Sequence, residues 1–217
     1  MDARKYLAEL IGTFILVGVG SMSIAAAVSM NAPILAVVPF GFGLGLLAAI
    51  QATGHVSGGH YNPAVTLAAW LDKRIEPSAA LAYVVAQVIG AVAASVVLLF
   101  VAGQDAVRAT ASGFPSGKSL NALVVEIVLS AIFLLVILTV TKRAPNQAAF
   151  AIPLTLSAIH FAGIPFSGAS VNPARSLAPA LVGGTLDANI LIWIAGPLVG
   201  AAIGWGLYRV LEAPREG

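Results

Sequence analysis

Residues 57–68 read SGGHYNPAVTLA and residues 167–178 read SGASVNPARSLA, so Ser, Gly, Asn, Pro, Ala, Leu and Ala recur at the same places. Asparagine is a favoured helix N-cap, and proline is favoured at the first helical position. The triplet Asn-Pro-Ala (NPA) therefore predicts an abrupt helix start. One copy would indicate nothing more, but a second copy in a matching context indicates a duplicated structural device.

The rest of the chain is strongly apolar. Of its 217 residues 59% are hydrophobic and only 9% are charged, whereas soluble domains carry about 25% charged residues. This composition predicts an integral protein of a lipid bilayer. The net charge of +2 comes from Lys and Arg clustered at loop positions, which indicates membrane orientation and no nucleic-acid partner. The absence of cysteine excludes disulfides, thiol catalysis and cysteine-based zinc sites.

Six stretches are long enough to cross a hydrocarbon core, which takes about 20 residues. These stretches are residues 6–28, 33–51, 77–102, 119–140, 147–162 and 188–210. The first could be confused with a cleaved signal peptide, but Glu9 interrupts its apolar run, so we predict a retained span. The two NPA segments fall between spans. A helix from Pro63 to Leu71 extends only about 13 Å into a core about 30 Å thick, so each NPA segment is predicted to begin a re-entrant half-helix.

The duplication extends beyond the NPA segments. The interval from Asn62 to Asn172 also separates AQVIGA at 86–91 from GPLVGA at 196–201. Each half of the chain then contains three spans. Because three is an odd number, the second half is predicted to enter the membrane inverted relative to the first.

The predicted fold is an all-α membrane protein with six transmembrane helices and two re-entrant half-helices. It forms one domain over residues 1–217, with inverted repeats at about 1–104 and 118–217. Lysine and arginine indicate its orientation. The side that holds the N-terminus carries Arg4, Lys5, Lys73, Arg74, Lys142, Arg143, Arg209 and Arg215. Arg108 and Lys118 fall on the other side. We therefore predict a multi-pass protein of the plasma or inner membrane with both termini in the cytoplasm.

The inverted repeat would bring two helix N-termini together near the membrane midplane. Each N-terminus carries about half a positive charge and unsatisfied N–H donors, so their meeting point disfavours cations. If Asn62 and Asn172 cap their own helices through the side-chain oxygen, each NH2 group stays free to point into a lumen. The non-helical residues before each asparagine cannot expose bare carbonyls to lipid, so we expect them to line a water-filled cavity.

The chain resembles the aquaporins of the major intrinsic protein family, in particular the bacterial water-selective members. The resemblance rests on AELIGTF at 8–14, SGGHYNPAVT at 57–66, VVEIVLSAIFLL at 124–135 and SVNPARS at 170–176. It implies a passive channel that conducts water in single file and excludes protons and ions. It also implies a homotetramer in the bilayer, with no cofactor, no metal and no enzymatic activity.

The resemblance also assigns residues. The two NPA motifs of the pore would be Asn62, Pro63, Ala64, Asn172, Pro173 and Ala174. The carbonyls that accept hydrogen bonds from water would belong to Gly58, Gly59, His60, Tyr61, Gly168, Ala169, Ser170 and Val171. The narrow selectivity filter would be built from Phe42, His160, Ala169 and Arg175. Without the resemblance, the less favoured alternatives are that His160 makes an interhelical hydrogen bond and that Arg175 extends to the outer membrane interface.

Two acidic residues fall inside predicted spans. Glu9 and Glu126 open the first and fourth spans, at an interval slightly longer than that of the NPA motifs, so they too are duplicated. An intramembrane carboxylate is a candidate for proton coupling. The resemblance implies instead that these acids accept hydrogen bonds from the re-entrant loops and hold the NPA backbones in place, and we favour this supporting role.

Three other functions compete with a water channel. Glycerol-conducting relatives usually carry Asp directly after the arginine that follows the second NPA, where this chain has Ser176. A glycerol facilitator is therefore the second hypothesis after a water channel. A proton-coupled transporter also uses inverted repeats and broken helices. An intramembrane hydrolase is disfavoured because His55, His60 and His160 have no Cys or Asp partners at ligand spacing.

Overall fold

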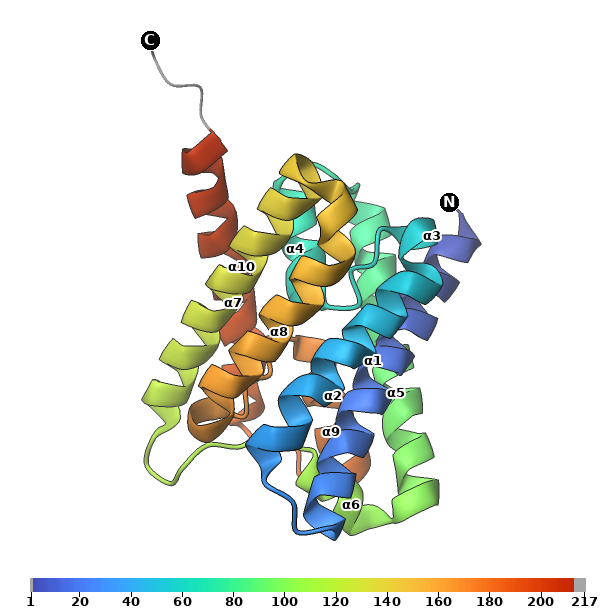
Figure 1. Cartoon of the computed structure of the whole chain (residues 1–217), viewed down its shortest axis with the longest axis vertical. Helices are drawn as coiled ribbons and strands as arrows, with labels where there is room; N and C mark the ends of the chain where they lie inside the picture. Colours follow the sequence, from blue (N-terminus) through green and yellow to red (C-terminus); the bar gives the residue numbers. More distant parts are fainter. Residues whose placement is uncertain (1, 213–217) are drawn as a thin grey trace.

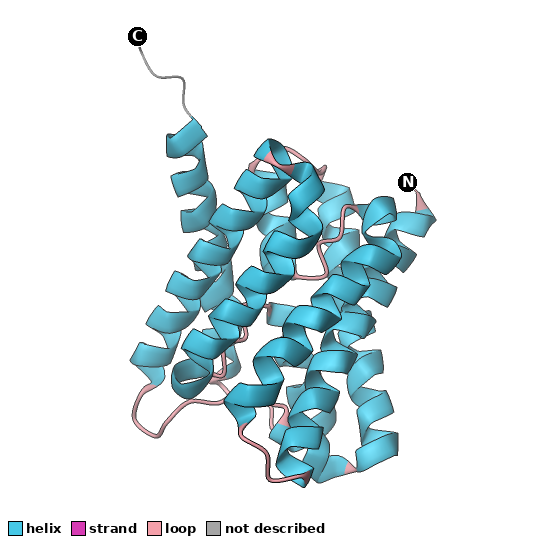
Figure 2. Cartoon of the chain, viewed as in Figure 1, coloured by secondary structure: helices cyan, strands magenta, loops and turns pink. Residues whose placement is uncertain are grey.

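The computed structural model describes residues 2–212, and every regular element in that range is helical (Figures 1 and 2). The long helices are α1 (Ala3–Ser29), α2 (Ile34–Ala49), α5 (Pro77–Ala102), α7 (Ser119–Arg143), α8 (Pro145–Ser167) and α10 (Ile190–Glu212). The shorter elements are η1 (Ile50–Gly54, a π-helical turn), α3 (His55–Ser57), α4 (Pro63–Leu71), α6 (Gln104–Ala109) and α9 (Pro173–Gly183). Of the charged residues discussed above, Arg215 lies outside the described range.

Within residues 2–212, six helices are long and apolar enough to cross a membrane, as the sequence predicts. The predicted short helices after the NPA triplets are α4 and α9, with nine and eleven residues. At 1.5 Å per residue they extend only about 13 and 16 Å, so they are half-helices that begin inside the bundle. The predicted fold class is therefore confirmed.

The second and fifth spans differ most from the predicted bounds. The second was expected at 33–51, but the π-helical turn η1 joins α2 to α3 and the helix continues to Ser57. The fifth was expected at 147–162 and ends at Ser167. Both stop at a glycine with positive φ, Gly58 at 89° and Gly168 at 75°. The apolar runs end earlier because the last turns contain polar residues and glycine, with Gln51, Thr53 and His55 in the second span and Gly163 and Ser167 in the fifth, so hydropathy does not detect them.

Each half-helix begins as the Asn-Pro pair predicts. Asn62 is extended with φ of −158°, and its side-chain oxygen accepts from the Ala64 N–H at 2.8 Å. Asn172 is extended with φ of −151°, and its oxygen accepts from the N–H groups of Ala174 and Arg175. These side chains satisfy donors that have no partner within the helix, and the following proline needs none.

Glycines let the long helices approach closely. A Cβ on Gly90 of α5 would overlap the Leu10 carbonyl of α1, and a Cβ on Gly200 of α10 would overlap the Ile127 carbonyl of α7. Small residues at such crossings are typical of membrane helices, where lipid gives no hydrophobic drive to associate. Each half-helix packs against the last long helix of the other half of the chain, because α4 contacts α10 and α9 contacts α5.

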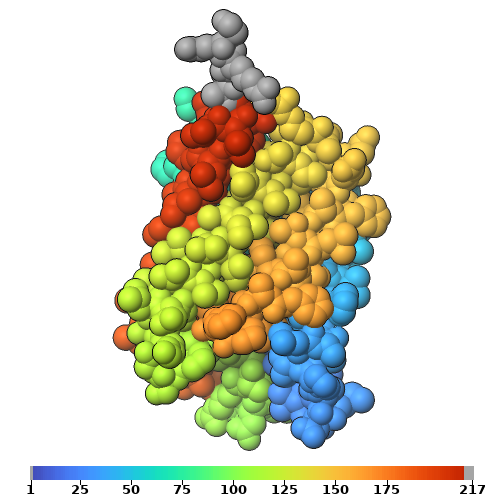
Figure 3. All heavy atoms as spheres, turned by 60° about the vertical axis from the view of Figure 1, so that its left-hand side comes forward, coloured from blue at the N-terminus to red at the C-terminus, as the bar shows by residue number. Residues whose placement is uncertain are grey.

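The arrangement places the start of α1 and the end of α10 at the same end of the bundle (Figure 1). We call this the terminal end. On the face seen in Figure 3, α7 and α8 lie side by side, in agreement with their contacts. The interior between the helices holds residues 57–62 and 167–172, which we call the first and second NPA loops, and the candidate site is built there.

Candidate functional site

A cavity of about 290 Å³ lies in the interior of the bundle, between the two NPA loops on one side and the helices α1, α2, α7 and α8 on the other. At the terminal end, near the last turns of α7 and α10, its wall includes Arg74 and Thr141, and at the other end it reaches Phe42, His160 and Arg175. Polar groups of the NPA loops form one part of the wall, from Ser57, Gly58, Gly59, His60, Asn62, Ser170, Val171 and Asn172. Most of the remaining wall is apolar, from Leu16, Leu46, Val65, Ala69, Phe133, Leu134, Ile137, Leu138, Ile152 and Leu156.

The two NPA asparagines hold the opposite loops together. The Asn62 Nδ2 donates to the Val171 carbonyl at 2.8 Å, and the Asn172 Nδ2 donates to the Tyr61 carbonyl at 3.0 Å. An amide nitrogen has two hydrogens, so each asparagine keeps one N–H beyond this cross-link. The sequence predicted that the whole NH2 group would be free, and the structure corrects this: only one of its two donors is.

The loops before the asparagines share an unusual backbone. Positive φ values occur at Gly58, Gly59 and Tyr61, and again at Gly168, Ala169 and Val171, the same three places in each copy. A valine in this left-handed region is a genuine outlier that stores strain on the order of 1–3 kcal/mol. The Val171 backbone is nevertheless held on both sides, because its N–H donates to Glu126 and its carbonyl accepts from Asn62.

Glu9 supports the first loop. It is fully buried on α1, and its Oε1 accepts from the Ser57 hydroxyl at 2.7 Å and the His60 N–H at 2.9 Å. Its Oε2 accepts from the Tyr61 N–H and the Gln87 Nε2, both at 2.7 Å. All four partners are donors, which is the environment of an acceptor-only, ionised carboxylate.

Glu126 supports the second loop in the same way. It is fully buried on α7, and its Oε1 accepts from the Ser167 hydroxyl at 2.7 Å and the Ser170 N–H at 2.8 Å. Its Oε2 accepts from the Val171 N–H at 2.8 Å. The position that matches Gln87 in the second half is Pro197, which has no side-chain donor, so Glu126 has one partner fewer than Glu9.

A second pair of supports was missed from the sequence. The Tyr83 hydroxyl donates to the Ser57 carbonyl, and the Trp193 Nε1 donates to the Ser167 carbonyl, both at 2.8 Å. Tyr83 and Trp193 are separated by the same interval as the two NPA asparagines. An alignment of the chain with itself at that interval would have placed Tyr83 opposite Trp193, although the two residues are not identical.

Three of the side chains predicted for the constriction come together at the end of the cavity away from the termini. The rings of Phe42 and His160 stack at a centroid distance of 4.5 Å and an angle of 18°. The Arg175 guanidinium carbon lies 5.0 Å from the centre of the Phe42 ring. All three residues are buried, with at most 5% of their surface exposed.

The polar atoms of this cluster are only partly satisfied. His160 Nδ1 lies 2.9 Å from the Leu156 carbonyl, which can only accept, so Nδ1 carries the hydrogen and Nε2 is an acceptor. Within residues 2–212, neither His160 Nε2 nor Arg175 Nε has a hydrogen-bond partner. Arg175 Nη1 donates to the Thr110 carbonyl at 3.2 Å and to the Ser112 hydroxyl at 2.8 Å.

Some predicted residues lie away from the cavity wall. Tyr61, Gly168 and Ala169 are not among the residues that line it, whereas the other carbonyl-bearing residues of the prediction are. The Ala169 methyl is fully buried and packs against Gly163 of α8. A Cβ added at position 163 would lie only 2.9 Å from this methyl. Its role in the constriction stays a prediction.

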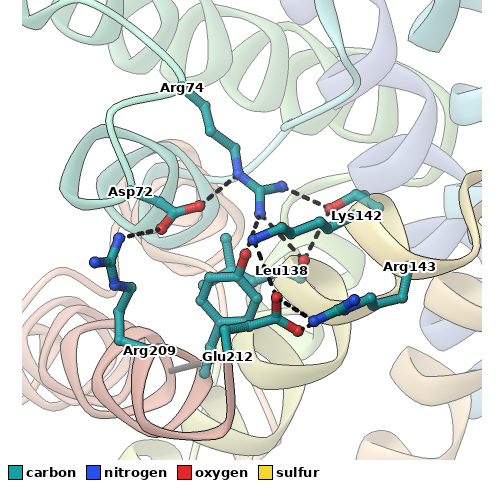
Figure 4. Close-up of polar contacts among 9 residues, drawn as sticks. Asp72, Arg74, Leu138, Lys142, Arg143, Arg209 and Glu212 are labelled. Carbon is teal, nitrogen blue, oxygen red and sulfur yellow. Dashed lines mark hydrogen bonds and ion pairs between the residues drawn. The ribbon is translucent and has the colours of Figure 1, made fainter. Parts of the chain in front are cut away.

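A second arginine, Arg74, lies in the cavity wall at the terminal end. From the sequence it indicated only the orientation in the membrane, and its structural role follows from the contacts drawn in Figure 4. Its Nε donates to Asp72 at 2.8 Å, its Nη1 to the Thr141 hydroxyl at 2.7 Å, and its Nη2 to the Leu138 carbonyl at 3.1 Å. Tyr208 lies 3.4 Å from the same Nη2. Arg74 therefore directs its donors to the wall and ties α4 to α7 and α10.

A network of ion pairs surrounds Arg74 (Figure 4). Glu212 at the end of α10 pairs with Lys142 at 3.0 Å and with Arg143 at 2.8 Å, and Arg209 lies 3.8 Å from Asp72. Four cations and two carboxylates leave this network with a net positive charge. No cluster of three or more His, Cys, Asp or Glu side chains suited to a metal ion occurs within residues 2–212.

Comparisons with known proteins place this chain among related sequences. Residues 1–208 match the family model described as major intrinsic protein. The chain is 43% identical to an aquaporin Z of Photorhabdus laumondii subsp. laumondii, over 98% of this chain and 99% of that protein. It is 38% identical to a glycerol uptake facilitator protein-like 6 of Lactiplantibacillus plantarum, over 96% and 98%. The fold is similar to that of the aquaglyceroporin from Plasmodium falciparum, with a TM-score of 0.81, 22% identity and 95% of each chain covered.

Proposed function

The chain belongs to the major intrinsic protein family, and from that premise we propose that it is a water-selective channel that excludes protons and ions. As a member of this family it is a passive, multi-pass membrane channel for water or small solutes and not an enzyme. Its selectivity is the open point, because similar relatives carry the names aquaporin and glycerol uptake facilitator.

The observation that carries the proposal is the cluster of Phe42, His160 and Arg175. His160 stacks on the Phe42 ring and Arg175 lies close to it, so little apolar surface is left for the CH groups of glycerol. Water, in contrast, can donate to His160 Nε2 and accept from Arg175 Nε, the two buried atoms of this cluster that have no partner among the described residues. We assign these three residues to the selectivity filter and keep Ala169 beside them as a prediction.

Conduction would follow from the NPA loops. The free N–H of Asn62 and of Asn172 would each donate to a water molecule at the centre of the pore. Carbonyls on both sides would accept from the file of water: Gly58, Gly59, His60, Ser170 and Val171. The positive ends of α4 and α9 face this centre, which disfavours cations there.

A proton-coupled transporter is disfavoured by the surroundings of the two buried acids. Glu9 and Glu126 accept from four and three donors, and these donors belong mainly to the NPA loops. A proton on either carboxyl group would have to displace one of those hydrogen bonds and loosen the loop. We therefore assign both acids to loop support.

The position in the membrane is part of the same proposal. We place the terminal end in the cytoplasm, because the cations around Arg74 lie there and cytoplasmic loops carry an excess of Lys and Arg. We propose that the protein lies in the plasma or inner membrane and, because of its family, that it forms a homotetramer. We also propose inverted repeats at about 1–104 and 118–217, because the contacts that support the two loops are duplicated. Protease access to tagged termini in sealed vesicles tests the orientation.

The direct test of function is stopped-flow light scattering on proteoliposomes. With an impermeant osmolyte, we expect vesicles that contain the protein to shrink much faster than empty vesicles. With glycerol, they should shrink and then fail to re-swell on that time scale. Water flux should not respond to an imposed pH gradient. Glycerol entry at a rate comparable to that of water would instead favour the facilitator, and flux driven by the pH gradient would favour the transporter.

Mercurials give a second test, because they bind thiolates and the chain has no cysteine. We expect the parent to keep its water flux in mercuric chloride. Val65→Cys places a thiol in the cavity wall beside Asn62, so its flux should fall severalfold and recover with a thiol reductant. Ala169→Cys decides the open position: a block equal to that of Val65→Cys would put Ala169 in the filter, and resistance would leave it packing against α8.

A further inference from the structure

A chain of three serine hydroxyls connects Arg175 to the second NPA motif. Arg175 Nη1 lies 2.8 Å from Ser112 Oγ, which lies 2.6 Å from Ser176 Oγ. Ser176 Oγ lies 2.5 Å from Ser170 Oγ, and Ser170 Oγ donates to the Asn172 carbonyl at 2.9 Å. Ser112 belongs to the segment between α6 and α7, outside both proposed repeats, whereas the other members belong to the second NPA loop and α9.

The direction of this hydrogen-bond chain follows from the number of hydrogens. A guanidinium group can only donate, so Ser112 Oγ accepts from Arg175. The single Ser112 hydrogen is then available for Ser176, and the single Ser176 hydrogen for Ser170. The chain ends on a backbone carbonyl, which can only accept. Each of the three serine hydrogens is therefore used once, in one direction, from Arg175 to the Asn172 carbonyl.

The first half of the molecule contains the matching chain without an arginine. Thr66, the counterpart of Ser176 in the first repeat, donates to the Asn62 carbonyl at 3.2 Å and accepts from Gln87 Nε2 at 2.9 Å. In the second half the place of Gln87 is taken by Pro197, which cannot donate. The second chain takes its first donor from Arg175 instead, and Ser112 is the link that makes this possible.

We propose that Ser112 is a positioning residue that holds the Arg175 guanidinium in the constriction and thereby sets the exclusion of small neutral solutes. This inference rests on the proposed function of Arg175 in the filter. Ser112 and Thr110 together bind Nη1, which leaves Nε as the buried atom without a partner among the described residues. Without the Ser112 hydroxyl, the guanidinium keeps among the described residues only the longer bond to the Thr110 carbonyl, so it can turn away from Phe42.

The test compares Ser112→Ala with Ser112→Thr in proteoliposomes, with water and urea permeability measured on the same vesicles. Ser112→Ala should raise the ratio of urea to water permeability about three- to tenfold, the factor that corresponds to one lost hydrogen bond. Ser112→Thr keeps a hydroxyl and should restore the parental ratio. Ser95→Ala is the matched control, because the Ser95 hydroxyl is also buried but, in the described part of the chain, bonds only to the Ala91 carbonyl of its own helix.

Arg175→Val, measured alongside, separates the two proposals. If Arg175→Val admits urea while Ser112→Ala excludes it as the parent does, Ser112 does not position the arginine and the filter assignment stands. If Ser112→Thr leaks as much as Ser112→Ala, the hydroxyl is not responsible and the inference is wrong. If Arg175→Val also excludes urea, the filter assignment itself fails.

A second variant covers the case in which Ser112→Ala does not fold. Ser176→Ala removes the acceptor of the Ser112 hydrogen and leaves the bond from Arg175 to Ser112 possible. We expect a smaller rise in the ratio, about two- to threefold, because the Ser112 hydroxyl loses its fixed orientation but is still present. A ratio equal to that of the parent in folded Ser176→Ala would contradict the ordered chain.

Discussion

Arg175→Val should raise urea and glycerol permeability at least about tenfold while water permeability stays equal or rises. The guanidinium contributes a full positive charge and five N–H donors at a buried position, whereas a helix N-terminus contributes only about half a charge. Its loss removes one wall of the constriction next to Phe42 and His160. A decrease of about 1.4 kcal/mol in the barrier to a solute is already a tenfold change in rate.

The variant should fold, because the other half of the protein already contains the same residue at the same place. Val65 follows Asn62 by three positions, as Arg175 follows Asn172, and it occupies the first turn of α4. We also expect a proton leak, since the full charge that adds to the half-helix dipoles is gone. Solute re-entry and an internal pH-sensitive dye on the same vesicles measure both effects.

Arg209→Val is the matched control for this experiment. Arg209 lies at the end of α10, its side chain is 63% exposed, and its only ion pair within the described residues is the 3.8 Å contact with Asp72. The same change of residue there should leave solute exclusion as in the parent. If folded Arg175→Val excluded urea and protons as well as the parent does, Arg175 would be an anchor at the membrane interface and the filter would lie elsewhere.

Glu9→Gln and Glu126→Gln should strongly lower the thermal stability of the folded protein. Glutamine replaces one acceptor oxygen by a donor NH2 group, which would face donors that now bind the carboxylate. Glu9 Oε2 accepts from the Tyr61 N–H and Gln87, and Glu126 Oε2 accepts from the Val171 N–H. Each buried donor left without a partner raises the free energy of the folded state by about 1–3 kcal/mol.

Unfolding in detergent, followed by tryptophan fluorescence, measures this loss. Each variant should lose at least one such bond, because either amide orientation turns the new NH2 group toward a backbone N–H: that of His60 or Tyr61 at Glu9, and that of Ser170 or Val171 at Glu126. Glu76→Gln is the control, since Glu76 is exposed and its side chain does not cap α5, so its effect should stay within about 0.5 kcal/mol. A parent flux coupled to protons and abolished by Glu126→Gln would reverse the assignment and make the acid part of a transport mechanism.

The amino-acid sequence by itself determined the architecture. Hydropathy located six spans because lipid demands long apolar helices, and Asn-Pro located both half-helix starts because an N-cap and a residue without an N–H act locally. Duplication then identified Glu9 and Glu126, since one buried acid is ambiguous but two at matching places indicate a shared role. All of these signals are read within one segment or by aligning the chain with itself.

Only the tertiary structure decided which groups surround Arg175. Ser112 lies far before Arg175 in a segment without periodicity, and no local pattern indicates that its hydroxyl meets the guanidinium. The cross-links between the asparagines and the opposite loops, and the turn of the Ala169 methyl toward α8, were equally hidden. All of these features were hidden from the sequence for the same physical reason. The direction of a side chain in a loop follows from the φ values of individual residues, such as the left-handed φ at Ala169, and these values depend on contacts between distant segments.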